Sequence, residues 1–117
     1  MSQWTYIIGR IVVSPLGYSH EQRLNTLKNI ISTLPSITGS EGNMQIAFNQ
    51  SDEEYVLRIK GELRDRQIEQ TVKEYGKFIH KLKQKIDVKR IYVEITGQGK
   101  KIYWKKGLEK WTQKIIM

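Results

Sequence analysis

Residues that could do chemistry are few in this chain, and they do not gather in the sequence. The two histidines, His20 and His80, lie far apart, and there is no cysteine to share a metal with either of them. A zinc site needs several His, Cys, Asp or Glu ligands at set spacing, and no such spacing surrounds either histidine. No local pattern indicates Ser-His-Asp catalysis. We therefore interpret both histidines as surface or helix-capping residues, and we predict no enzymatic activity, no metal and no cofactor.

Three acidic residues, Glu62, Asp65 and Glu69, form a second candidate site. They lie near a predicted junction between a strand and a helix, where their carboxylates could gather. Arg64 and Arg66 flank them, and a guanidinium beside a carboxylate favours a charge-assisted ion pair. We expect a local network of ion pairs there.

The stretch TGSEGN at residues 38–43 combines two glycines with hydroxyl side chains, as phosphate-binding loops do. It lacks the Lys-Ser/Thr ending of a P-loop, and it precedes a predicted strand rather than a helix. We therefore favour a connecting loop over a ligand site.

Hydrophobic periodicity predicts the elements that position these residues. Apolar residues at every second position indicate strands, and apolar residues three and four apart indicate amphipathic helices. The first predicted helix places Leu24, Leu27, Ile31 and Leu34 on one stripe, and the second places Ile68, Val72, Tyr75, Ile79, Leu82 and Ile86 on another, with Phe78 on a different face. The predicted elements are a strand at residues 4–13, a helix that begins with the capping box Ser19–Gln22 and stops before Pro35, a strand at 44–48, a strand at 55–61, a helix from the N-cap Asp65 to about Lys85, and a strand at 90–95.

This order, βαββαβ, predicts an α+β fold of the ferredoxin-like type. Right-handed crossovers would place both helices on one face of a four-stranded antiparallel sheet. We assign residues 1–97 to this domain. Residues 98–117 form a basic C-terminal extension, with a strand at residues 100–106 and a short helix or a loose arm at 108–116, packed on the same domain or extending from it.

The sheet face away from the helices is the predicted binding surface. Strand side chains alternate, so the residues that do not face the helices point to this open face. Two interpretations remain open. The apolar residues Trp4, Ile8 and Val12 would be covered by the tail or by a second copy, or the aromatic residues would stack on single-stranded nucleic acid. The strand at 55–61 lacks the outward aromatic residues of an RRM domain. The predicted binding residues are Trp4, Tyr6, Arg10, Arg58, Lys60, Arg90 and Tyr92, beside Gln45 and Ala47.

The net charge of +8 lies in the last third of the chain. Residues 1–80 hold equal numbers of basic and acidic side chains, whereas residues 81–117 hold 11 Lys or Arg and 3 Asp or Glu. Such a patch suits nucleic acid, an acidic protein face or an anionic surface. Its excess of lysine over arginine favours a solvated face that serves solubility. The tail contributes Lys100, Lys101, Lys105 and Lys106. No apolar run approaches the roughly 18 residues of a membrane span, and we see no signal peptide, so we expect no membrane partner.

Three stretches of this chain, taken together, are similar to stretches of known proteins. They are WTYIIGRIVVSPLG at residues 4–17, LPSITGSEGN at 34–43 and GELRDRQIEQT at 61–71. The chain resembles a group of small uncharacterised accessory proteins encoded by tailed phages of Gram-positive bacteria. The resemblance covers roughly residues 4–96. Members of the group often carry a longer insert near residues 49–54, so this chain is short there, and the lysine-rich tail lies outside the resemblance.

The resemblance implies an accessory protein that works in the cytoplasm of a host cell. Small phage proteins without catalytic groups commonly act by binding, and an inhibitor of a host defence system is one such role. We therefore expect a host protein as the partner, with nucleic acid as the alternative and a homodimer as a further possibility. The basic charge disfavours mimicry of DNA.

Overall fold

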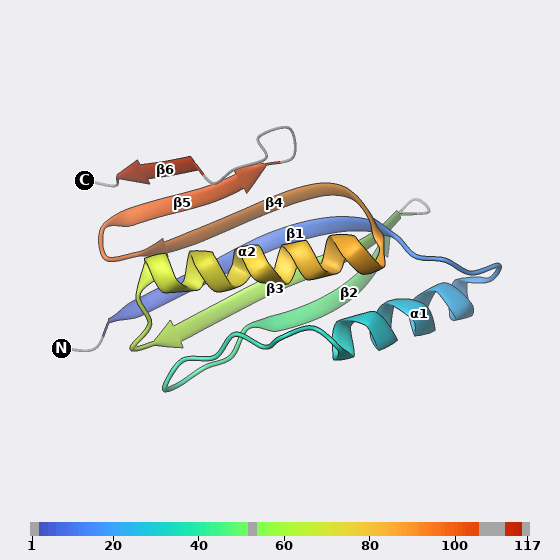
Figure 1. Cartoon of the computed structure of the whole chain (residues 1–117), viewed down its shortest axis with the longest axis horizontal. Helices are drawn as coiled ribbons and strands as arrows, with labels where there is room; N and C mark the ends of the chain where they lie inside the picture. The colour runs from blue at the N-terminus through green and yellow to red at the C-terminus, as the bar shows by residue number, and fades with distance from the viewer. Residues whose placement is uncertain (1–2, 52–53, 106–111, 116–117) are drawn as a thin grey trace.

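One antiparallel sheet organises the chain, with strand β1 (Trp4–Ser14) near its centre (Figure 1). The computed structural model describes residues 3–51, 54–105 and 112–115. Within them the strand order is β2-β3-β1-β4-β5-β6. The elements are β1 (Trp4–Ser14), α1 (His20–Ser32), β2 (Gln45–Ser51), β3 (Glu54–Arg64), α2 (Ile68–Lys85), β4 (Asp87–Gly97), β5 (Lys100–Lys105) and β6 (Thr112–Ile115).

Helix α2 covers one face of this sheet, and the core lies between them. Ile7 and Ile11 of β1, with Leu57 and Ile59 of β3, meet the helix in a single buried cluster. Five residues of the predicted α2 stripe are buried, so that prediction is confirmed except at Val72; they are Ile68, Tyr75, Ile79, Leu82 and Ile86. Phe78, which we placed on another face, is fully buried, whereas Val72 is only half-buried. Our prediction for Phe78 was therefore wrong.

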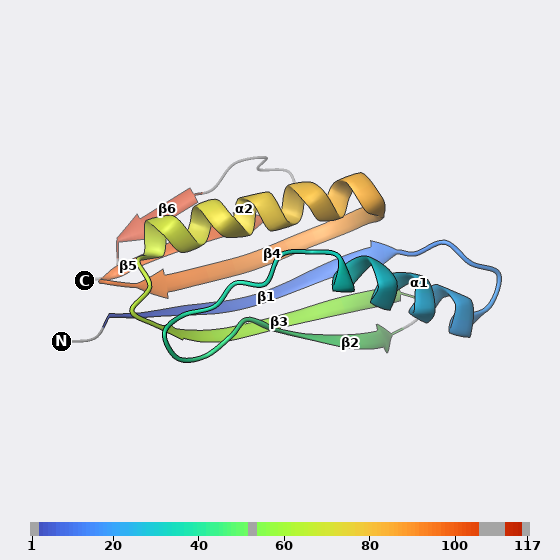
Figure 2. The same cartoon turned by 60° about the horizontal axis from the view of Figure 1, so that its bottom comes forward.

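Helix α1 packs on the same side of the sheet but is offset toward the β2 edge (Figures 1 and 2). Its predicted capping box forms only in part: Ser19 Oγ accepts a hydrogen bond from the Gln22 amide at 3.2 Å, but Gln22 Oε1 accepts from the Tyr18 amide at 2.9 Å rather than from the Ser19 amide. Of the predicted stripe, Leu27 is fully buried, and the other residues pack against the core while partly exposed. The α+β prediction is thus confirmed, with an open antiparallel sheet and two helices, but the topology is not strictly ferredoxin-like. The sheet continues past β4, and α1 lies to one side.

Helix α2 begins at Ile68 rather than next to Asp65. Asp65 adopts a left-handed conformation, with φ of 56°, and its amide donates to the Gln3 carbonyl at 2.6 Å, so it cannot serve as the N-cap. The Ile68 amide is satisfied instead by Gln98, whose Oε1 accepts at 2.9 Å. The Gln98 Nε2 also donates to the Trp4 carbonyl at 2.9 Å. One side chain in the β4–β5 turn therefore ties the start of α2 to the start of β1.

The C-terminal segment extends the sheet sideways. Strand β5 pairs with β4, and Thr112–Ile115 pairs with β5 as β6, where we had expected a short helix or an arm. The rest of that prediction, at residues 108–111 and 116, lies outside the described residues. No helix in the described parts of the chain is long and apolar enough to cross a membrane.

Candidate binding surface

The open face, defined as the sheet surface opposite α2, displays large side chains to solvent. Ile8 is 60% exposed, Tyr6 is 47% exposed and Tyr92 is 39% exposed. Arg10 lies on the same face and is also exposed. Strands β5 and β6 continue the sheet at its edge rather than fold back across this face (Figure 1). Within residues 3–51, 54–105 and 112–115, the chain therefore leaves the centre of the face uncovered.

One end of the open face is closed by an ion pair. Arg90 of β4 reaches Glu54 of β3 at 2.6 Å, and β1 lies between these two strands. Val12 lies in the register beneath this bridge, and both Val12 and Val56 are buried, at 3% and 1% exposure. Our expectation that Val12 contributes to an exposed patch was wrong, because sheet alternation gives the direction of a side chain but not what lies over it. Arg90 is thus neutralised within the fold.

Three cations in the middle of the face have no such neutralisation. Arg10 and Arg58 are direct cross-strand partners, and Lys60 lies beside Ile8 in the same register. None of the three forms an ion pair with a carboxylate in the described residues. Like charges directly opposite each other in a sheet are destabilising. Sequence alternation placed these residues on the face, but only the register between β1 and β3 reveals that the two arginines are opposed.

Aromatic rings border these cations. Trp4 and Tyr6 stack with centroids 6.4 Å apart and an interplanar angle of 16°. Tyr92 is the cross-strand partner of Arg10, and its hydroxyl donates to Glu94. This hydrogen bond, together with partial burial and the nearby Glu94 charge, raises the pKa of Tyr92. The face thus offers rings at one end and a neutral phenol beside the guanidinium of Arg10.

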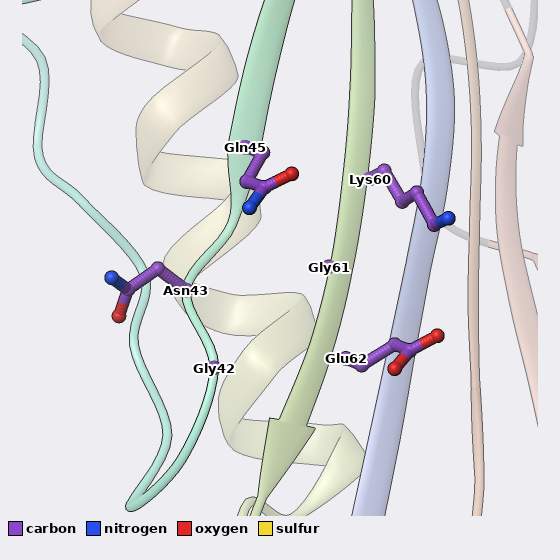
Figure 3. Close-up of a pocket in the computed structure, with 6 residues that line it drawn as sticks. All are labelled: Gly42, Asn43, Gln45, Lys60, Gly61 and Glu62. Atoms are coloured by element: carbon purple, nitrogen blue, oxygen red, sulfur yellow. The ribbon is translucent and has the colours of Figure 1, made fainter.

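A hollow of about 600 Å³ lies where β1, β2 and β3 meet on this face. Ile8 and Ala47 give it an apolar floor, and Arg58 and Lys60 supply its charge. A smaller hollow follows it toward the end of β3 (Figure 3), where Lys60 and Glu62 extend over β1. The arrangement suits a partner group that is apolar and negatively charged. The residues that line the larger hollow are Ile8, Gly9, Gln45, Ile46, Ala47, Arg58, Ile59 and Lys60.

The two tail lysines whose side chains the structure describes, Lys100 and Lys101, each pair with a carboxylate. Lys100 lies on the α2 side, where its Nζ is 2.7 Å from Glu69 Oε1 and lowers the pKa of that carboxyl through the hydrogen bond. Lys101 lies 3.4 Å from Glu94 Oε1. The side chain of Lys105 and the whole of Lys106 lie outside the described part of the structure.

The other chemical candidates have structural partners. His20 stacks on Tyr55 with centroids 5.6 Å apart and bonds to its hydroxyl at 2.9 Å. His80 lies 3.2 Å from the Gln84 side chain. Among the residues that the structure describes, no three His, Cys, Asp or Glu side chains gather where a metal ion could be held.

The acidic residues near the β3–α2 junction do not gather. Arg64 pairs with Glu41 at 2.5 Å and lies 4.0 Å from Asp65, whereas Arg66 pairs with Glu74 and Lys100 pairs with Glu69. The predicted ion pairs are present, but they also involve carboxylates outside the three predicted acidic residues, namely Glu41 and Glu74.

The loop at residues 38–43 uses its amides internally. The Gly39 amide donates to the Gly42 carbonyl at 3.0 Å, and the Ser40 amide donates to the Arg64 carbonyl at 2.9 Å. Gly42 has a φ of 81°, and a Cβ there would lie 1.9 Å from the Glu62 carbonyl oxygen, which explains this glycine as a packing requirement. The loop therefore braces the end of β3 and does not offer those two amides to a phosphate.

Comparison of the chain with protein-family models, with curated proteins and with solved structures finds no significant match.

Proposed function

We propose that this chain is a non-catalytic phage accessory protein that binds an acidic host protein through the open face in the host cytoplasm. Inhibition of a host defence system is the role that fits such a protein. In this proposal residues 1–97 form the binding domain, as a variant of the ferredoxin-like arrangement, and β5 and β6 extend its sheet at one edge.

The observation that carries the proposal is the uncovered centre of the open face. Ile8 lies exposed on the same face as Tyr6 and Tyr92, and exposed apolar groups that gather on one surface mark interaction sites. The three cations beside them have no carboxylate partner in the described residues, and Arg10 and Arg58 repel each other across the strands. A partner with apolar and acidic groups would bury Ile8 and neutralise the three cations. Arginine and aromatic residues are also the types enriched at protein interfaces.

Affinity capture from a lysate of Gram-positive host cells tests this proposal. The native chain is expected to retain one stoichiometric acidic protein, and Ile8→Asp is expected to lose it, because a carboxylate in the apolar floor repels the partner. The matched control is Leu16→Asp, since Leu16 is 82% exposed and precedes α1, outside the sheet. Retention of the same protein by both variants would place the interface elsewhere, and capture of nothing by the native chain would refute the proposal.

A second candidate function is the binding of single-stranded nucleic acid, which the stacked Trp4–Tyr6 pair favours. Single-stranded nucleic acid is held by aromatic platforms beside cations, and the open face supplies both. In this alternative, Arg10, Arg58 and Lys60 would contact phosphates while Tyr6 stacks on a base.

The nucleic-acid alternative predicts that Tyr6→Ala weakens binding to a single-stranded oligonucleotide by about 1–3 kcal/mol. Fluorescence anisotropy measures this affinity, which must also fall steeply with rising salt because phosphate contacts release counterions. Tyr18→Ala is the control, because Tyr18 is 99% exposed and lies before α1, away from the open face. Absence of binding at low salt, or equal losses in the two variants, would dismiss this alternative.

A further inference from the structure

The two edges of the sheet are built differently. Strand β6 is only four residues long, and a short edge strand discourages pairing with another strand. Charged residues, proline and bulges discourage it as well. Strand β2 is seven residues long and reads QIAFNQS, with no charged residue and no proline. Its register with β3 runs without a bulge. Strand β2 therefore lacks each of these protections, although the chain as a whole is highly charged.

We propose that β2 is the interface of a homodimer, in which it pairs antiparallel with β2 of a second copy. This inference is independent of the open-face function. In the described residues β2 pairs with β3 alone, so its outer edge has backbone groups available for a further strand.

The side-chain pattern of β2 suits pairing with itself. A two-fold axis at Phe48 would place Phe48 beside the partner's Phe48 and Ala47 beside the partner's Asn49. Ile46 would lie beside the partner's Gln50, so no charged side chain opposes another. Ile46 and Phe48 are only half-buried on the helix side, and a second strand would cover more of their surface.

Electrostatics also permit a second copy despite the net charge of +8. The nearest rows of open-face cations, at Arg58 and Lys60 on β3, would be three strand spacings apart, which is roughly 14 Å. This separation exceeds the screening length of about 8 Å at physiological salt. The open faces of both copies would remain uncovered on one side of the continuous sheet.

Light scattering on size-exclusion fractions tests this proposal. The native chain is expected at twice the mass of one chain, and Ala47→Lys/Asn49→Lys is expected at the mass of a single chain, because the lysine at 47 would then face the partner's lysine at 49, and the reverse. The control Asn25→Lys/Asn29→Lys adds the same charge at exposed positions of α1 and should leave the dimer intact. Ile8→Asp should also leave it intact, since the open face takes no part.

Three results would overturn the proposal: a native chain that stays monomeric at every concentration tested, a dimer that survives the β2 lysines, or a dimer that Ile8→Asp dissociates. If the β2 variant does not fold, amide hydrogen exchange on the native chain decides. Exchange in β2 must slow as protein concentration rises, and exchange that is independent of concentration contradicts the interface.

Discussion

Replacing Phe78 with alanine is expected to lower the free energy of unfolding by about 3–5 kcal/mol, as for other fully buried aromatic residues. Phe78 is 0% exposed and packs against Tyr75 with ring centroids 5.5 Å apart. The substitution therefore removes apolar contacts, opens a cavity under α2 and loses an aromatic pair. Chemical denaturation monitored by circular dichroism measures the change.

Val72→Ala provides the control, because the predicted helix stripe placed Val72 inside and Phe78 outside. Val72 is half-buried, so its truncation should cost about 1 kcal/mol. A larger loss at Val72 than at Phe78 would mean that α2 is rotated from the orientation described above.

Replacing Arg58 with glutamate is expected to weaken binding of an acidic partner by about 2–5 kcal/mol, because a carboxylate then faces the partner's acidic groups. The same substitution is expected to stabilise the free protein by about 0.2–1 kcal/mol. Arg58 lies opposite Arg10, so the change converts a repulsive cross-strand pair into an attractive one. Thermal unfolding measures the stability, and quantitative capture measures the binding.

Lys77→Glu is the matched control for Arg58→Glu. Lys77 is exposed on α2, on the other side of the sheet, and the substitution changes the net charge by the same amount. If the binding loss reflects net charge alone, both variants will lose affinity equally. If the open face is the interface, only Arg58→Glu will lose affinity for the partner.

The elements of this fold could be predicted because their signals are local. The alternation of apolar residues in β1 and β3 indicates which side of each strand is apolar. The spacing of three and four residues around Leu27 in α1 and around Tyr75 in α2 does the same for the helices. The N-cap hydrogen bond from the Gln22 amide to Ser19 is likewise formed between residues only three positions apart. These signals were enough for the α+β class and for the identity of the open face.

The features that the sequence did not reveal depend on contacts between distant segments. Gln98 caps α2 from 30 positions away, and only the β4–β5 turn brings it there. Phe78 and Val72 flank the same helix stripe, so the packing of α2 on the sheet decides between them. Val12 is buried at the end of the open face where Arg90 and Glu54 meet across β1, and this contact joins residues that are 36 positions apart. Periodicity contains none of this information.

The same distinction applies to the candidate binding surface. Alternation identified Arg10, Arg58 and Lys60 as outward residues, and the structure places all three on the exposed side of the sheet. Alternation also placed Arg90 among the binding residues of the open face, but Arg90 pairs with Glu54. The cross-strand register decides which cations have a carboxylate partner. Alternation along one strand does not specify that register.

Capture of a host protein by the native chain, by Arg58→Glu and by Lys77→Glu, measured in parallel from one lysate, tests the open face most directly. We expect stoichiometric capture by the native chain and by Lys77→Glu, and loss of that protein from Arg58→Glu at an unchanged or higher melting temperature. Equal capture by all three would contradict it, because the unneutralised arginine pair would then have no part in binding.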